Sequence, residues 1–172
     1  MKVTHLKTTL LKFPLPTPTV PTYSVNPVHI FPDMRPGAGG GGGGDRPHMV
    51  VLQVETDEGI TGLANTNVAT TAVQTVIKDH FAPLVMGQDP FQTELLWEKM
   101  FRAGITLGRQ GVSSTALSLI DIALWDIKGL ALGQPVYNLL GGKTKEKLRA
   151  YASRLYGPDT GQLAAEAAMY VE

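Results

Sequence analysis

The sequence of 172 residues contains no cysteine. A disulfide framework, a zinc–thiolate site and a thiolate nucleophile are therefore excluded for this chain. The absence fits a reducing compartment, and we expect a cytoplasmic protein. A charge bias is lacking too, because 15 Lys and Arg residues balance 15 Asp and Glu residues. A neutral chain offers no electrostatic footprint for nucleic acid or an anionic membrane, so we expect neither as a partner.

Long apolar runs are also missing. Residues 1–12 alternate polar and apolar side chains and carry three lysines, without the apolar core of a secretory signal. The uncharged stretch at residues 111–120 includes four hydroxyl side chains and is followed by Asp121. Such a stretch is too short and too polar to span a bilayer. The sequence therefore predicts a soluble protein.

The first third of the chain has the pattern of strands around a long loop. Alternating polar and apolar residues predict strands over residues 3–13 and 49–56. A tight turn at residues 57–59 then leads to a third strand over residues 60–64. Residues 14–47 contain eight prolines and seven glycines, which predicts a long loop between the first two strands.

Helical patterns follow the strands. The first predicted helix ends near Pro83, and the second begins at Asp89-Pro90. Their apolar faces comprise Val73, Val76, Ile77, Phe81 and Leu84 in the first, and Phe91, Leu95, Leu96 and Met100 in the second. A third helix, capped by Ser113 or Ser114, is expected to run to about Leu130 and to end at Gly133. Its apolar face comprises Ala116, Leu119, Ile120, Ala123, Leu124, Ile127 and Leu130.

The remaining residues predict a short helix over 135–140, a strand over 148–153 and a helix over 159–172. The order of elements indicates an α+β fold, in which a three-stranded antiparallel meander is followed by a helical bundle. We place one domain at residues 1–145, including the loop at 14–47. Residues 146–172 would begin a second domain as its first βα unit. Because the last helix has no following strand on which to pack, we expect the chain to be truncated.

Residues 116–142 read ALSLIDIALWDIKGLALGQPVYNLLGG. This stretch resembles the helix signature of the mandelate racemase and muconate lactonising enzymes of the enolase superfamily. The matching positions are Ala116, Ser118, Asp121, Ala123, Leu124, Asp126, Gly129, Pro135, Val136, Leu139, Leu140 and Gly141, whereas Leu119 and Leu130 depart mildly. The turn sequence at 56–62 and Tyr151-Ala152-Ser153 fall in the family's order. The resemblance implies an enolase-like N-terminal capping domain with the start of an incomplete (β/α)₈ barrel.

The resemblance also implies a chemistry. In this family a base removes the proton α to a substrate carboxylate, and Mg²⁺ stabilises the resulting enediolate. The bases and the three metal-binding carboxylates lie on later barrel strands. We therefore expect no catalytic and no metal-binding residue in this chain, which would be inactive alone. The full-length enzyme would be a lyase or an isomerase, and a homo-oligomer.

What remains for this chain is substrate selection, because the family's capping domain closes over the barrel with two loops. The resemblance places these loops at residues 14–47, after the first strand, and at residues 65–68, after the third. The candidate substrate contacts are Tyr23, His29, Arg35, Arg46 and His48 in or beside the first loop, Asn65 and Asn67 in the second, and Ser153 at the end of the first barrel strand. The alternative for each of these loop residues is that it is a solvated surface group and does not contact the substrate. A small carboxylate substrate, an acid sugar, suits these polar groups.

Two aspartates of the signature helix have structural interpretations. Asp121 and Asp126 are five residues apart and so do not form a carboxylate pair on one helix face. We expect Asp121 to bond a backbone group or an arginine where the two domains meet, and Trp125 to pack.

Several readings of function stay open. A sugar-acid dehydratase is favoured by the long, arginine-bearing first loop, with a mandelate-type racemase or epimerase and a cycloisomerase as alternatives. The glycine run at 39–44 lacks the Lys-Ser/Thr ending and the helix of a phosphate-binding loop. The competitor from another class is a non-enzymatic α+β domain used for binding or assembly. Limited proteolysis would separate it from a truncated enzyme, which should lose its tail from about Lys145 onward.

Overall fold

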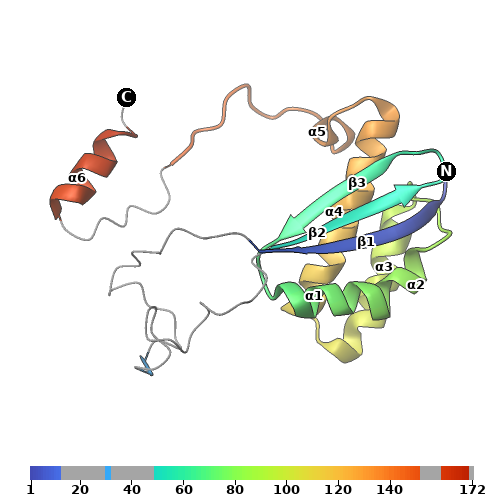
Figure 1. Ribbon diagram of the computed structural model, residues 1–172. Helices are drawn as coiled ribbons and strands as arrows, with labels where there is room; N and C mark the ends of the chain where they lie inside the picture. The colour runs from blue at the N-terminus through green and yellow to red at the C-terminus, as the bar shows by residue number, and fades with distance from the viewer. Residues whose placement is uncertain (13–29, 32–48, 152–159, 171–172) are drawn as a thin grey trace. The chain divides into compact units, whose positions relative to one another are not determined.

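The computed structural model describes residues 1–12, 30–31, 49–151 and 160–170 (Figure 1). The chain divides into two compact units, and each is considered by itself. Residues 1–12 and 47–144 make up the first unit, and residues 13–46 and 145–172 make up the second. The predicted loop at 14–47 lies outside the described residues except for Ile30 and Phe31.

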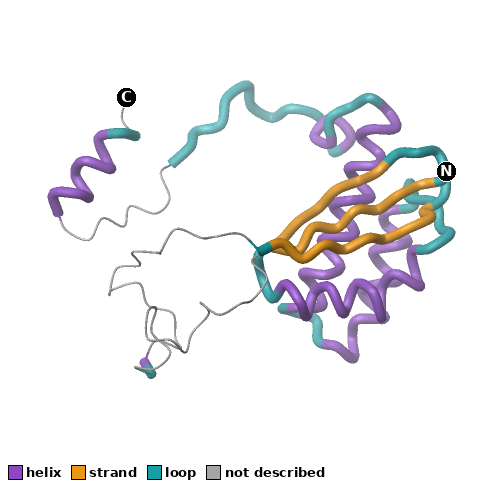
Figure 2. Tube along the Cα trace, in the orientation of Figure 1, coloured by secondary structure: helices purple, strands orange, loops and turns teal. Residues whose placement is uncertain are grey.

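The first unit contains the predicted antiparallel meander. Strands β1 (Val3–Leu11), β2 (Met49–Thr56) and β3 (Thr61–Thr66) form one sheet in the order β1-β2-β3. Along β2, fully buried apolar residues alternate with half-buried ones, as expected for a sheet that is covered on one face. The helices cover that face, and α4 runs behind the strands in Figure 2.

A continuous helical stretch from Thr70 to Val85 follows the sheet. It consists of α1 (Thr70–Val76), the π-helical turn η3 (Ile77–Phe81) and α2 (Ala82–Val85). Val73, Ile77, Phe81 and Val85 are all fully buried. In an ideal α-helix a spacing of four residues drifts by about 40° at each step. The wider π turn, in which the Ala82 N–H bonds the Ile77 carbonyl, offsets this drift and keeps the four side chains on one face.

The later helices of the first unit are α3 (Thr93–Ala103), the 3-10 turn η4 (Gly104–Leu107), α4 (Val112–Leu132) and α5 (Val136–Leu139). As predicted, Gly133 ends α4 with a left-handed backbone conformation. In the second unit the described helix is α6 (Thr160–Ala168), within the predicted range 159–172.

Two predicted helix starts are wrong. Helix α3 begins at Thr93 and not at Pro90, because the Asp89 carboxylate accepts the Phe91 N–H at 2.9 Å and closes a separate turn. Helix α4 begins after Gly111, and neither serine caps it. Ser113 is buried within the first turn, and the Ser114 hydroxyl donates to the Arg109 carbonyl at 2.7 Å.

Other boundaries and core positions also differ from the prediction. Leu95 and Leu130 are 47% and 57% exposed, so they do not belong to the core. Strand β3 extends to Thr66, two residues beyond the predicted end. The strand predicted over 148–153 is not formed at residues 148–151, where no described strand pairs with this segment. Its last two positions, 152–153, lie outside the described residues.

Both edges of the sheet form hydrogen bonds with other elements, which reduces the hazard of an open strand edge. On the β1 side, the Val3 N–H donates to the Gln88 carbonyl at 2.9 Å and the Gly87 N–H donates to the Val3 carbonyl at 2.8 Å. The Gln74 amide of α1 donates to the Thr8 hydroxyl at 3.0 Å. On the β3 side, the Leu63 N–H donates to the Asp126 carboxylate of α4 at 2.9 Å.

Helix α4 lies directly against the backbone of β3 at Gly62. A Cβ atom at this position would overlap the Ala123 carbonyl oxygen and would lie 2.8 Å from Ile127 Cγ1. Glycine is thus required here for close approach, which is a recognised use of glycine within a strand. The contact fixes α4 across the sheet with its buried face inward.

The turn between β2 and β3 is closed by its own polar side chains. The Thr56 hydroxyl accepts the Ile60 N–H at 3.1 Å and donates to the Ile60 carbonyl at 2.9 Å. The Asp57 carboxylate accepts the Lys2 N–H at 2.7 Å, and Glu58 pairs with the α-amino group of Met1 at 2.9 Å. The turn therefore also holds the first residues of the chain.

Substitution of Gly62 by alanine should destabilise the first unit strongly. The added methyl group meets a backbone carbonyl that can move only with α4, and overpacking of this kind typically costs about 1–3 kcal/mol or more. Urea denaturation measures the change. Leu63→Thr, on the exposed side of the same strand, is the matched control and should have a much smaller effect. Equal stability of Gly62→Ala and the parent would contradict the close contact.

The ion pair of Met1 with Glu58 predicts a dependence of stability on alkaline pH. The hydrogen bond to Glu58 is the main cause of the raised pKa of the α-amino group, whose ordinary value is 8.0. A raised pKa of a basic group means that its stabilisation is complete below pH 8.0 and is lost as the pH rises through the folded-state pKa. In melting curves between pH 7 and pH 10, Glu58→Gln should lose this part of the alkaline decline. Glu55→Gln serves as the control, and an unchanged decline in Glu58→Gln would refute the assignment.

Candidate functional site

The two loops that were predicted to select substrate start from strand ends at one end of the sheet. Leu11, the last residue of β1, pairs with Met49, the first residue of β2. Thr66, the last residue of β3, pairs with Val50 next to it. The ends of β1 and β3 therefore lie on either side of the start of β2. This end of the sheet is the candidate site within the described residues.

Asn65 and Asn67 are the candidate contacts that the structure describes, and both are exposed. Asn65 belongs to β3 and pairs with Val51, and Asn67 follows the strand directly. The connection to α1 is short and fixed. The Val68 N–H donates to the Thr66 hydroxyl at 3.2 Å, and Ala69 has a left-handed backbone conformation with φ of 45°. The structure thus brings the two asparagines together at the sheet end.

The other candidates lie outside the described residues. They are Tyr23, His29, Arg35, Arg46, His48 and Ser153.

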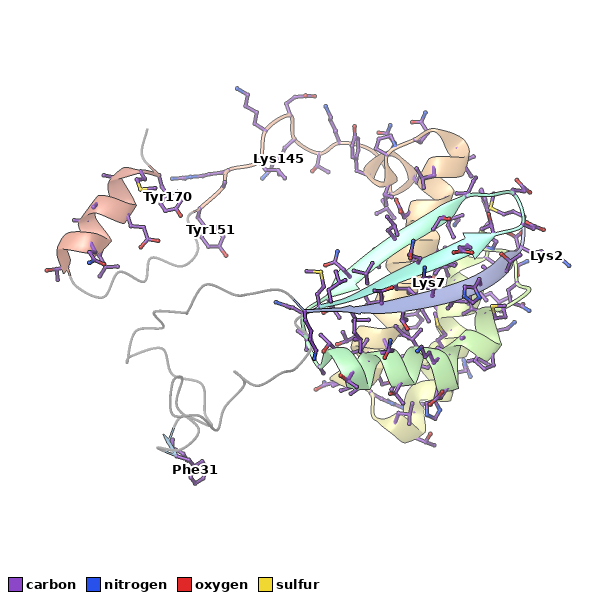
Figure 3. The ribbon with its side chains drawn as sticks, viewed as in Figure 1. Lys2, Lys7, Phe31, Lys145, Tyr151 and Tyr170 are labelled. Carbon is purple, nitrogen blue, oxygen red and sulfur yellow. The ribbon has the colours of Figure 1, made fainter. Side chains whose placement is uncertain are left out.

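The residue types on the open face of the sheet differ from one end of the strands to the other. Its rows follow from the strand register and are Thr9–Val51–Asn65, then Lys7–Gln53–Leu63, then His5–Glu55–Thr61. Lys7 is labelled on β1 in Figure 3. Among the described residues at the candidate end, the polar side chains offer amide and hydroxyl groups and the ammonium group of Lys12, with no carboxylate. Such groups can hydrogen-bond the hydroxyls and the carboxylate of a substrate, whereas a divalent metal prefers several carboxylate oxygens.

Within residues 1–12, 30–31, 49–151 and 160–170, no three His, Asp or Glu side chains gather in a way that could hold a metal ion. In the same ranges no helix is long and apolar enough to cross a membrane.

Several residues of the signature helix α4 make structural contacts within the first unit. Asp126 closes the edge of β3, as described above. Trp125 is half-buried, and the Lys128 ammonium lies 4.5 Å from its ring centroid. Gly129 allows the chain to turn back, because a Cβ there would lie 2.9 Å from the Gln134 carbonyl oxygen. The bond of Asp126 and the close approach at Gly129 were not predicted from the sequence. The close contact at Gly62 was not predicted either, although a lone glycine within a strand is a signal of close approach.

Asp121 has no comparable structural contact. It is half-buried, and no residue in the described ranges donates a hydrogen bond to its carboxylate. Burial is the main cause of its raised pKa, the charge of Glu94 on α3 adds to the effect, and Lys128 partly offsets it. The backbone group or arginine predicted as its partner is not found among the described residues, so that partner stays a prediction.

Comparison with known proteins assigns the family. The family described as mandelate racemase / muconate lactonizing enzyme, N-terminal domain, matches residues 32–141. A D-galactonate dehydratase family member from Marinomonas sp. (strain MWYL1) is 41% identical over 106 residues, which are 60% of this chain and 26% of the relative. A D-mannonate dehydratase from Rhizorhabdus wittichii is 37% identical over 127 residues, which are 73% of this chain and 31% of the relative.

Solved structures agree with the sequence match. The crystal structure of a racemase from Streptomyces coelicolor A3(2) with bound magnesium superimposes with a TM-score of 0.63 at 27% identity. The superposition covers 82% of this chain and 36% of that chain. The chain thus spans about a quarter to a third of the length of the curated relatives that it matches. From the family match and the meander with its helices, we conclude that this chain belongs to the mandelate racemase and muconate lactonizing enzyme family of the enolase superfamily and contains its N-terminal domain.

Proposed function

We propose that the chain is the N-terminal part of a Mg²⁺-dependent sugar-acid dehydratase and supplies its substrate-selecting cover. The observation that carries the proposal is the match to relatives named D-galactonate dehydratase family member and D-mannonate dehydratase. The reaction removes the proton α to the carboxylate and then the β-hydroxyl group, which leaves as water. The enol product becomes a 2-keto-3-deoxy acid.

The polar end of the sheet fits this role. Asn65 and Asn67 are exposed there, and an amide side chain can both donate to a substrate carboxylate and accept from a hydroxyl group. We propose them as substrate contacts. The same role is proposed for the candidates outside the described residues, which are Tyr23, His29, Arg35, Arg46, His48 and Ser153. An arginine among them could bind a carboxylate through two parallel hydrogen bonds.

The catalytic machinery is assigned to other residues. When bound, magnesium would supply positive charge to stabilise the enolate oxygen. The described residues contain no group suited to hold it. The relatives are longer than their matched segments. We therefore propose that the metal ligands and the catalytic bases lie in a segment that corresponds to the unmatched part of these relatives.

A racemase is the second candidate, and the match to the magnesium-bound racemase supports it. Both reactions begin with loss of the α-proton. They differ in whether the enolate then expels the β-hydroxyl group or is reprotonated on the opposite face.

The proposed activity can be assayed in a longer protein of which these 172 residues form a part. With magnesium, D-galactonate or D-mannonate should give a 2-keto-3-deoxy acid, and the 172-residue chain alone should give none. Colorimetric detection of the keto acid provides the measurement. Turnover restricted to apolar aryl acids would refute a sugar-acid substrate, and deuterium exchange at the α-carbon without loss of water would favour the racemase.

In the same longer protein, Asn65→Ala should raise KM for the acid sugar by about tenfold, with a smaller change in kcat. This figure corresponds to the loss of one hydrogen bond to a charged group. Gln53→Ala, on the same face of the sheet but one row away, is the matched control and should leave KM near the parent value. Identical KM values for the Asn65→Ala variant and the parent would exclude Asn65 as a substrate contact.

A further inference from the structure

The turn between β3 and α1 contains a residue with an unfavourable backbone conformation. Ala69 has φ of 45° and ψ of 40°, and the other positive φ angles among the described residues belong to glycines. In this left-handed region the Cβ atom of an L-residue comes too close to the following carbonyl oxygen, so that mainly glycine and sometimes asparagine adopt it. A strained backbone of this kind persists only where the surrounding structure imposes it.

Alanine is also poorly suited to the second role of this position. Ala69 is the N-cap of α1, and its carbonyl accepts the Val73 N–H at 2.9 Å without a side-chain cap. Asparagine would suit both roles, because it tolerates the left-handed region and is among the best N-caps. The Ala69 side chain is exposed, so burial of its methyl group does not explain the choice. Stability alone would thus favour another residue here.

The elements on either side of the turn impose the conformation. Residues 67–69 separate β3 from α1. Thr66 is held by its pairing in the sheet, whereas Thr70 and Val73 anchor the start of the helix with exposed fractions of 8% and 0%. Within the turn, the Val68 N–H donates to the Thr66 hydroxyl at 3.2 Å. Both ends and the middle of the turn are therefore held, and the backbone angles of its last residue complete the path.

Alanine allows this turn fewer backbone conformations than glycine would. For alanine the left-handed region is one small well, whereas glycine populates the positive-φ side widely. Glycine would thus relieve the strain but would also loosen the turn. Asn67, which lies exposed two residues before Ala69, depends on the turn for its place at the end of the sheet. A polar contact binds better when it is already held in its bound position.

We propose that Ala69 is a positioning residue, whose left-handed backbone holds Asn67 in place for substrate binding. The inference rests on the proposed function, because it takes Asn67 as a contact of the acid sugar. Ala69 acts through Asn67 and does not itself need to touch the substrate. The strain that is accepted at Ala69 reduces the ordering that substrate binding would otherwise require.

The effect on the turn can be measured in the 172-residue chain with Ala69→Gly. By NMR relaxation, the backbone order parameters of Asn67 and Val68 should be about 0.85 in the parent and should fall toward about 0.6 in the variant. The melting temperature should not fall, because relief of strain offsets the greater freedom of glycine in the unfolded chain. Ala103→Gly, at the exposed end of α3, is the matched control. It should lower the melting temperature and leave both order parameters unchanged.

The effect on binding can be measured in a longer protein of which these residues form a part. Ala69→Gly should raise KM for the acid sugar about two- to fivefold and leave kcat nearly unchanged. Ala69→Asn is the conservative variant, because asparagine is compatible with the left-handed conformation. It should keep KM and the order parameters at the parent values. A purely structural role would change the melting temperature and not KM.

Three results would overturn the proposal. The first is that the order parameters of the turn stay at the parent values in Ala69→Gly. The second is a loosened turn with an unchanged KM, which would mean that the turn does not position a substrate contact. The third is a KM of Ala69→Asn as high as that of Ala69→Gly, which would assign the effect to the methyl group. If the parent protein converts no acid sugar, the proposed function fails, and the order parameters alone then decide whether Ala69 fixes the turn.

Discussion

The first unit depends on the contact between α4 and β3. The helix backbone meets the strand at Gly62, where the Ala123 carbonyl leaves no room for a side chain. One turn further along, the Asp126 carboxylate accepts the Leu63 N–H at 2.9 Å. A close backbone contact and a hydrogen bond to a charged group thus act at neighbouring residues, and each fixes the register for the other. The buried face of α4 completes the core from this position.

The existence and type of the elements could be predicted because their apolar periodicity is strong. The meander, the long helix and its end at Gly133 follow from local patterns. The helix starts at Thr93 and Val112 could not be read in the same way, because the Asp89 side chain forms its own turn and Gly111 precedes α4 without a side-chain cap. The failed strand at 148–151 has a related cause, since a strand needs a partner that local sequence does not reveal.

The candidate site was less accessible to sequence reasoning than the fold. The sequence placed the two loops after the first and third strands, and only the strand register shows that these strand ends, with Asn65 and Asn67, lie at one end of the sheet. The roles of side chains in the signature helix depend on tertiary contacts. Asp121 and Asp126 are both aspartates of the same helix, but their surroundings differ. The Asp126 carboxylate accepts the Leu63 N–H at the edge of β3, whereas the pKa of Asp121 is raised by burial and by the like charge of Glu94.

The contact of α4 with β3 positions the buried face of α4 over the sheet. Native-state hydrogen exchange of the Leu63 amide tests it most directly, because this N–H lies on the edge of the sheet and has Asp126 as its acceptor. The account predicts slow exchange, with an opening free energy close to that of global unfolding. Rapid exchange at Leu63, as expected for a frayed edge strand, would contradict it.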